Sequence, residues 1–162
     1  MIVTINTDAS YSKTHKIGTY AFWIICNQGK CAKSGVLKRK CHRPEEAEFQ
    51  CIINAIHTLC KSKITGVKKI IINTDCLNVI HLIRGNKSLI SYYKLGFGKN
   101  MVEQFEKILK VNGYEKVVLE MRHVKAHEST ETARQWVNEW CDQEAKKRLR
   151  QAVAEQKINR GE

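Results

Sequence analysis

The order in which strand-like and helix-like segments follow one another constrains the fold of this chain more than any other feature. Three segments rich in apolar and β-branched residues come first, at 2–7, 19–26 and 31–37. A turn at 27–30 joins the second and third as a hairpin. A helical pattern then covers 44–59, and 67–73 is typical of a fully buried strand. Because a helix separates the third and fourth strands, the chain must cross the sheet there, which predicts parallel pairing beside an antiparallel hairpin.

The remaining segments complete an α/β architecture. They are a short helix from about 75 to 84, a basic and aromatic segment at 85–99, a helix at 100–112, a strand at 115–124 and a long helix from about 132 to 156. Pro44 occupies the favoured first turn of the earlier helix, and Thr74 can cap the short one. We therefore expect a five-stranded mixed sheet, with an antiparallel hairpin on one side and helices on its faces. At 162 residues, one domain over 1–162 is the natural count.

Composition excludes several classes of protein. With 43% hydrophobic and 27% charged residues, the chain is typical of a globular protein rather than a disordered one. No 18-residue apolar run predicts a transmembrane helix, and the first residues lack the pattern of a secretory signal. The seven cysteines form no C-x-x-C pair, so we expect reduced thiols in a cytoplasmic protein and no zinc site.

The positive charge is concentrated in one part of the chain. The net charge is +12, and residues 1–102 hold 16 basic against 5 acidic side chains. Clustered Lys and Arg favour a polyanionic partner, because neutralising phosphates releases their counterions. A face that only keeps the protein soluble is the alternative. The basic tail at 146–162 is interpreted first as a solvated helix face and second as an auxiliary phosphate contact.

Two aspartates stand alone within these basic stretches. Asp8 is the only acid among residues 1–44, and Asp75 is the only one among 49–102. Each directly follows a predicted apolar strand. If those strands are parallel neighbours, both carboxylates emerge at the carboxyl edge of the sheet, where α/β proteins place their sites. Capping of a turn or helix is the alternative, above all for Asp75.

Two further acids have unusual positions on predicted helices. Glu48 lies on the same helical stripe as Ile52, Ile56 and Leu59, so it points toward the sheet and needs a partner or a metal. Asp142 lies at the edge of the apolar face of the last helix, where a solvated rim position is its alternative. That face comprises Trp136, Val137, Trp140, Cys141, Ala145 and Leu149, and we expect it to be core.

Four carboxylates at one sheet edge would repel one another unless divalent cations lay between them. Oxygen ligands of this kind suit Mg²⁺ or Mn²⁺. Two such ions about 4 Å apart can clamp the attacking and leaving oxygens of a phosphoryl displacement. The basic surroundings would then hold a nucleic acid.

The order of these motifs resembles the type-1 ribonuclease H family over nearly the whole chain. The matching segments are Ile5-Asn6-Thr7-Asp8-Ala9-Ser10, Ala47-Glu48-Phe49, Asn73-Thr74-Asp75, Val124-Lys125-Ala126-His127 and Asn138-Glu139-Trp140-Cys141-Asp142-Gln143-Glu144-Ala145. The resemblance implies a ribonuclease H-like fold and a two-metal endonuclease that cuts the RNA strand of RNA–DNA hybrids, leaving 5′-phosphate and 3′-hydroxyl ends. The acids that it implies as metal ligands are Asp8, Glu48, Asp75 and Asp142.

The resemblance also assigns roles outside the acids. It places His127 on a loop near the cleaved phosphate, where it would assist proton transfer or product release. The candidate substrate-binding residues are Ser10, Asn138, Lys87, Lys94 and Lys99. The three lysines belong to a segment that also carries Tyr92, Tyr93 and Phe97 and that sits where many family members have a basic handle. Packing of these aromatic residues onto the domain is the alternative.

Some positions depart from the family, and other functions stay open. Pro44, Glu45 and Glu46 stand where the family often has groove-reading asparagines, and Leu77 stands where a Gln is common. A catalytically idle nucleic-acid-binding module is one alternative, and another nuclease of this fold, such as a junction resolvase, is a second. A domain of a reverse transcriptase is a third. We expect an RNA–DNA hybrid as the partner, no membrane and a monomer.

Overall fold

The computed structural model describes residues 1–86, 88, 97–125 and 132–161. Five strands form one sheet in the order β3-β2-β1-β4-β5. Their bounds are β1 Ile2–Ser12, β2 Ile17–Cys26, β3 Gly29–Val36, β4 Lys69–Thr74 and β5 Val118–His123. β2 is antiparallel to both β1 and β3, whereas β4 is parallel to β1 and β5. The mixed sheet predicted from the sequence is therefore confirmed.

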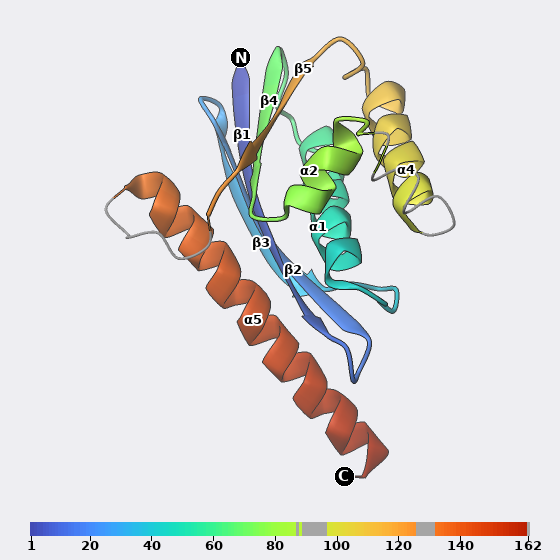
Figure 1. Cartoon of the computed structure of the whole chain (residues 1–162). Coiled ribbons are helices and arrows are strands. Elements are labelled where there is room, and N and C mark those ends of the chain that lie inside the picture. Colours follow the sequence, from blue (N-terminus) through green and yellow to red (C-terminus); the bar gives the residue numbers. More distant parts are fainter. Residues whose placement is uncertain (87, 89–96, 126–131, 162) are drawn as a thin grey trace.

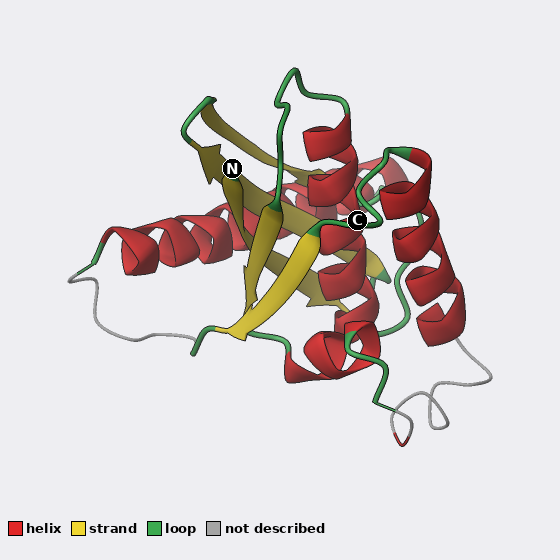
Figure 2. Cartoon of the chain, turned by 90° about the horizontal axis from the view of Figure 1, so that it is seen from above, coloured by secondary structure: helices red, strands yellow, loops and turns green. Residues whose placement is uncertain are grey.

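Helices cover both faces of the sheet. They are α1 Pro44–Cys60, α2 Leu77–Ile83, α4 Phe97–Val111 and α5 Ala133–Arg160. Figure 1 shows α1, α2 and α4 on one side and α5 alone on the other, and the view in Figure 2 shows the sheet between these layers. Among the described residues, no helix combines the length and the apolar character that crossing a membrane needs.

The main core lies between α1 and the sheet. Because side chains alternate along a strand, β1, β2 and β4 each turn every second residue toward α1. The largest side chains that are fully buried in this layer include Ile5, Phe22, Ile24, Phe49, Ile52, Ile56, Ile70 and Ile72. This packing fixes α1 against β1 and β2, and with it the position of Glu48 near the amino end of the helix.

The packing of α5 on the opposite face uses small residues. Cys141 and Ala145 are fully buried against Ala21 of β2, which lets the helix approach the sheet closely. Thr19 Oγ1 donates a hydrogen bond to the carbonyl oxygen of Ala145 at 2.7 Å. Thr132 forms a capping box with Gln135 at the start of the helix.

The prediction that Trp136 belongs to the core is wrong. Its side chain is 52% exposed, and its ring meets that of Trp23 edge-on, with centroids 5.6 Å apart. The residue lies in the first turns of α5, ahead of the stretch where Cys141 enters the interior. The apolar stripe therefore predicts correctly which face of α5 packs against the sheet, but it does not predict where along the helix this packing begins.

Two element boundaries also differ from the prediction near the acids. The strand expected to end at Asp8 continues to Ser12, because β2 stays paired with it that far. The helix expected from about residue 75 begins at Leu77, with Cys76 at its N-cap. The Thr74 hydroxyl instead accepts the Cys76 N–H at 3.2 Å, so it stabilises the turn before the helix.

Candidate active site

Two parallel strands bring Asp8 and Asp75 to the same place. The printed sequence repeats Ile-Asn-Thr-Asp at 5–8 in β1 and at 72–75 at the end of β4. The parallel ladder pairs these repeats in register, and its last pair is Asn6 with Asn73. Each aspartate is two residues beyond that pair, Asp8 within β1 and Asp75 directly after the last residue of β4. The expectation that both carboxylates meet at this sheet edge is fulfilled.

Glu48 reaches the same place from α1. Its side chain is only 8% exposed, as its position on the apolar stripe predicted. The backbone N–H of Ala9 lies 2.8 Å from Asp8 Oδ1 and 3.1 Å from Glu48 Oε1, so one donor serves two carboxylates. The second oxygen of Glu48, Oε2, is buried without a hydrogen-bond partner. A buried carboxylate oxygen in this state needs a cation or a proton.

The three carboxylates form one cluster that opens toward solvent. One oxygen from each of Asp8, Glu48 and Asp75 lies within 4.8 Å of the others, and burial decreases in the order Glu48, Asp8, Asp75. Burial, followed by the charges of Asp75 and Asp142, raises the pKa of Asp8 to about 8. Burial, followed by the charges of Asp8 and Asp75, holds the pKa of Glu48 well above its usual value. Both pKa shifts have the same two causes, burial first and the charges of neighbouring carboxylates second.

This donor set fits a hard divalent cation. All three side chains offer carboxylate oxygen, the ligand that Mg²⁺ and Mn²⁺ prefer, and Glu48 Oε2 is a ready ligand atom. A cation would relieve the repulsion that otherwise forces protons onto the cluster. Among the described residues, this is the one group of three or more acidic, Cys or His side chains close enough to hold a metal.

Asp142, the fourth predicted ligand, lies beside this cluster rather than within it. Its Oδ2 accepts a hydrogen bond from Lys146 Nζ at 2.7 Å on the same helix, and its side chain is 29% exposed. Its charge nonetheless contributes to the raised pKa of Asp8. Ser10, in β1, and Asn138, in α5, are both half-buried on the elements that carry Asp8 and Asp142.

Several other predicted site residues lie outside the part of the chain that the structure describes. They are His127, Lys87, Lys94, Tyr92 and Tyr93. Lys99 is described: it is exposed near the start of α4 and lies 3.8 Å from Glu103.

The first-turn acids of α1 have structural partners. Glu45 Oε1 accepts a hydrogen bond from Asn78 Nδ2 of α2 at 3.2 Å, and Glu46 Oε2 accepts the His42 N–H at 2.8 Å. Both acids lie in the first turn of α1, near the positive end of the helix dipole, and their hydrogen bonds also tie the helix to its neighbours.

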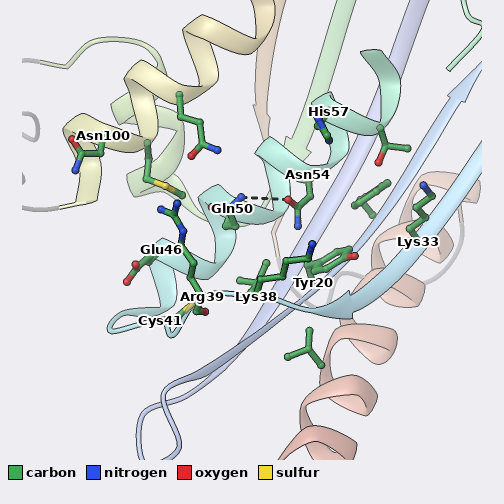
Figure 3. A pocket seen from close by; sticks show the side chains of 16 residues that line it. Tyr20, Lys33, Lys38, Arg39, Cys41, Glu46, Gln50, Asn54, His57 and Asn100 are labelled. Carbon is green, nitrogen blue, oxygen red and sulfur yellow. Dashed lines mark hydrogen bonds between the residues drawn. The ribbon is translucent and has the colours of Figure 1, made fainter. Parts of the chain in front are cut away.

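A pocket of about 570 Å³ lies beside α1. Glu46 of α1 lines it, whereas Asp8, Glu48 and Asp75 of the acid cluster do not. As Figure 3 shows, its walls come from α1, β2, β3, the segment before α1 and the start of α4. The cationic side chains on its rim are Lys33, Lys38 and Arg39. The sequence analysis identified these cations as part of a basic stretch. It missed a polar stripe of α1 that also lines the pocket, formed by Gln50, Asn54 and His57. Their spacing of four and three residues, which places them on one side of a helix, was the signal that could have revealed it.

A buried thiol of α1, that of Cys51, contacts the backbone of β1 at the site. The sequence analysis did not identify this contact. The Cys51 Sγ lies 3.3 Å from the carbonyl oxygens of both Asp8 and Ala21, to which its S–H can donate. Burial keeps the pKa of Cys51 well above its usual value, so the thiol stays neutral beside the acids. All seven cysteines are free, as expected.

A mixed sheet in this strand order, with acids from β1, α1 and the end of β4 close together, places the protein in the class of α/β folds that carry a carboxylate cluster at the carboxyl ends of their central strands. The sequence model of the RNase H family matches residues 1–150, and this chain belongs to that family.

Solved structures agree with this assignment at the level of the fold. The RNase H1 of the halophilic archaeon Halobacterium salinarum is similar with a TM-score of 0.64 and 14% identity, over 93% of this chain and 99% of that one. The N-terminal RNase H domain of a Mycobacterium tuberculosis protein is similar with a TM-score of 0.65 and 12% identity, over 95% and 97%. The protease–reverse transcriptase of prototype foamy virus matches with a TM-score of 0.60 and 16% identity, over 91% of this chain but 20% of that one. No curated protein sequence matches this chain.

Proposed function

We propose that this protein is a divalent-metal-dependent endonuclease that hydrolyses the RNA strand of RNA–DNA hybrids. The observation that carries the proposal is the cluster of Asp8, Glu48 and Asp75, with one oxygen of Glu48 buried and unpartnered. Membership of a nuclease family supports the reaction class. The excess of basic over acidic residues supports a polyanionic substrate.

The chain's own residues supply a fixed frame for the reaction. Asp8, Glu48 and Asp75 would hold Mg²⁺ or Mn²⁺, with Asp142 as the fourth candidate ligand. The chemistry that such ions would supply there is the activation of water and the stabilisation of the leaving 3′-oxygen, so that the products would carry 5′-phosphate and 3′-hydroxyl ends. The Ala9 N–H orients Asp8 and Glu48, and the burial of Glu48 keeps water from the inner side of the cluster. Asp75, which is exposed, faces the side from which a substrate can approach.

Substrate binding would use the cationic surfaces around this frame. The pocket beside α1 offers Lys33, Lys38 and Arg39 to backbone phosphates. We further assign substrate contacts to Ser10, Asn138, Lys87, Lys94 and Lys99, and assistance in proton transfer or product release to His127.

Cleavage and binding measured on the same variants test this proposal. Asp75→Asn keeps the size of the side chain but removes a ligand charge, so it should abolish Mg²⁺-dependent cleavage of a labelled hybrid while leaving hybrid binding nearly unchanged. Glu139→Gln is the matched control, because Glu139 is an exposed acid of α5 whose Oε1 only accepts a hydrogen bond from Gln143. Wild-type cleavage by Asp75→Asn would refute the site assignment. A wild-type protein that binds hybrids but never cuts them would indicate an idle binding module.

A further inference from the structure

The last helix extends beyond the part of the chain that the family shares. The family match ends at residue 150, whereas α5 continues without interruption to Arg160. Figure 1 shows this carboxyl-terminal part of α5 running past the end of the sheet. Within the extension Ala152 is buried, whereas Gln151, Ala154, Glu155 and residues 157–160 are exposed, so most of its surface is open to a partner.

One face of this extension is basic. Exposed cations recur along it at spacings of three to seven residues, which keeps them on one side of the helix. We call this surface the α5 basic face; it consists of Lys146, Arg150, Lys157 and Arg160, all exposed. The buried residues Cys141, Ala145 and Ala152 form a neighbouring stripe that faces the sheet.

The acids of this part of α5 lie on another side. Glu144 accepts a hydrogen bond from Ser34 Oγ of β3, so it faces the outer strand of the hairpin. Glu155 is eleven residues, or about three turns, further along and shares that side. Between Asp142 and Arg160, the α5 basic face therefore contains no acid.

The α5 basic face starts beside the acid cluster. Its first member, Lys146, pairs with Asp142, the candidate ligand that lies next to that cluster. From Lys146 to Arg160 the helix rises about 21 Å, a length that spans about six phosphates of one strand at about 3.4 Å each. The line of cations thus leads directly away from the place where a phosphodiester would be cut.

We propose that the α5 basic face binds the phosphodiester backbone of the nucleic acid where it leaves the active site. This inference rests on the proposed function and extends the substrate-binding surface beyond the family's shared domain. Phosphate is the partner because the face presents four cations on one side of the helix with no acid between them.

A simpler explanation accounts for some of these cations. Lys157 and Arg160 lie in the last turn of α5, where a positive charge stabilises the helix dipole without any partner. That explanation predicts a lower melting temperature when the cations are removed and no change in nucleic-acid binding. Salt dependence separates the two accounts, because only cations that contact phosphates release counterions on binding.

The test uses a triple variant, Arg150→Gln, Lys157→Gln and Arg160→Gln. Its affinity for hybrids of increasing length is measured over a series of salt concentrations, with EDTA present so that no strand is cut. For hybrids long enough to follow α5, we expect binding to weaken on the order of tenfold at moderate salt. The slope of log K against log salt should become shallower by about 2 to 3, since each lost phosphate contact removes about 0.9. For hybrids that cover little more than the acid cluster, the loss should be smaller.

The matched control removes three cations elsewhere. Lys63, Lys68 and Lys116 are exposed and lie by the amino ends of β4 and β5, at the sheet edge opposite the acids. Replacing all three with Gln changes the net charge equally but should leave the salt slope unchanged.

Each result has a definite meaning. A wild-type slope for the α5 variant on long hybrids overturns the inference, as does an equal change in both triple variants. If the wild type cuts hybrids in Mg²⁺ but the α5 variant binds them normally, only this inference fails. If the wild type neither binds nor cuts hybrids, the proposed function fails and this inference fails with it.

Discussion

Asn73 donates a hydrogen bond from its side-chain Nδ2 to Oδ1 of Asn6 at 2.8 Å, across the last pair of the β1–β4 ladder. Both side chains are almost completely buried, at 1% and 3% exposure. Buried amides are costly unless they are paired, and a slip of the register would leave both without this partner. The pair therefore fixes the register of the two strands two residues before Asp8 and Asp75, whose charges repel each other.

The first prediction concerns this amide pair. Asn73→Val alone should destabilise the protein by about 1–3 kcal/mol, because it leaves the Asn6 amide unsatisfied. The double variant Asn6→Val with Asn73→Val should regain most of that stability. It should nevertheless bind Mn²⁺ about tenfold more weakly, because the amide pair no longer fixes the spacing of the Asp8 and Asp75 carboxylates. Thermal melting and calorimetric titration with Mn²⁺ measure the two effects. Thr4→Val, two pairs earlier on the same face of β1, is the control and should change neither the stability nor the Mn²⁺ affinity. Unaltered Mn²⁺ affinity in the double variant would refute the role of the amide pair in spacing the carboxylates.

The second prediction concerns the stability cost of the acid cluster. Asp8→Asn should stabilise the metal-free protein by roughly 1–3 kcal/mol at pH 8, because it removes a buried charge that two neighbours repel. For a chain of this size, each kcal/mol raises the melting temperature by about 2–4 °C. The same variant should lose cleavage. Melting in EDTA measures the gain, and a lower melting temperature for Asp8→Asn than for wild type would contradict it.

The third prediction is a pH dependence of stability without metal. The carboxyl of Asp8 has a pKa of about 8 in the folded protein against 3.8 as its ordinary value, so the folded state binds this proton more tightly. The resulting stabilisation is complete below about pH 4 and is lost as the pH rises toward about 8. Urea unfolding in EDTA at pH 5, 7 and 9 should show this contribution falling. Saturating Mg²⁺ should reduce the loss, because the cation then replaces the proton; an identical pH profile with and without Mg²⁺ would argue against metal binding at this cluster.

The fourth prediction concerns the pocket beside α1. Replacing Lys38 and Arg39 with Gln should raise KM for hybrid cleavage several-fold and leave kcat nearly unchanged, because these side chains would hold phosphates equally in the ground and transition states. Steady-state kinetics at fixed ionic strength separate the two constants. Lys63→Gln, at the opposite sheet edge, should behave as wild type. A fall in kcat with KM unchanged would instead place the pair close to the reacting phosphate.

The acids could be located from sequence because their surroundings are so poor in acids. Asp8 and Asp75 stand alone in basic stretches at the ends of apolar strand patterns, and Glu48 interrupts an apolar stripe. Periodicity determines which face of an element is buried, and that information was sufficient to bring these three residues together.

The supporting contacts could not be located in this way. The bond between Asn6 and Asn73 depends on the register of two strands that lie 67 residues apart in the chain. No pattern in the sequence marks the Cys51 thiol, and only the packed structure shows its contact with the carbonyl oxygen of Asp8. Trp136 was predicted to be buried and is exposed. Its position on the apolar face of α5 was identified correctly, but the sequence did not reveal that the sheet leaves this part of the face uncovered.

The most direct test of the central claim is a cleavage assay with one labelled RNA strand, presented single-stranded, paired with RNA or paired with DNA. Each form is incubated with Mg²⁺, Mn²⁺ or EDTA. We expect metal-dependent cutting of the strand paired with DNA, no cutting of the other two forms and none in EDTA. Cutting in EDTA, or no cutting of the hybrid with either ion, would contradict the claim that Asp8, Glu48 and Asp75 form the metal centre of a hybrid-specific nuclease.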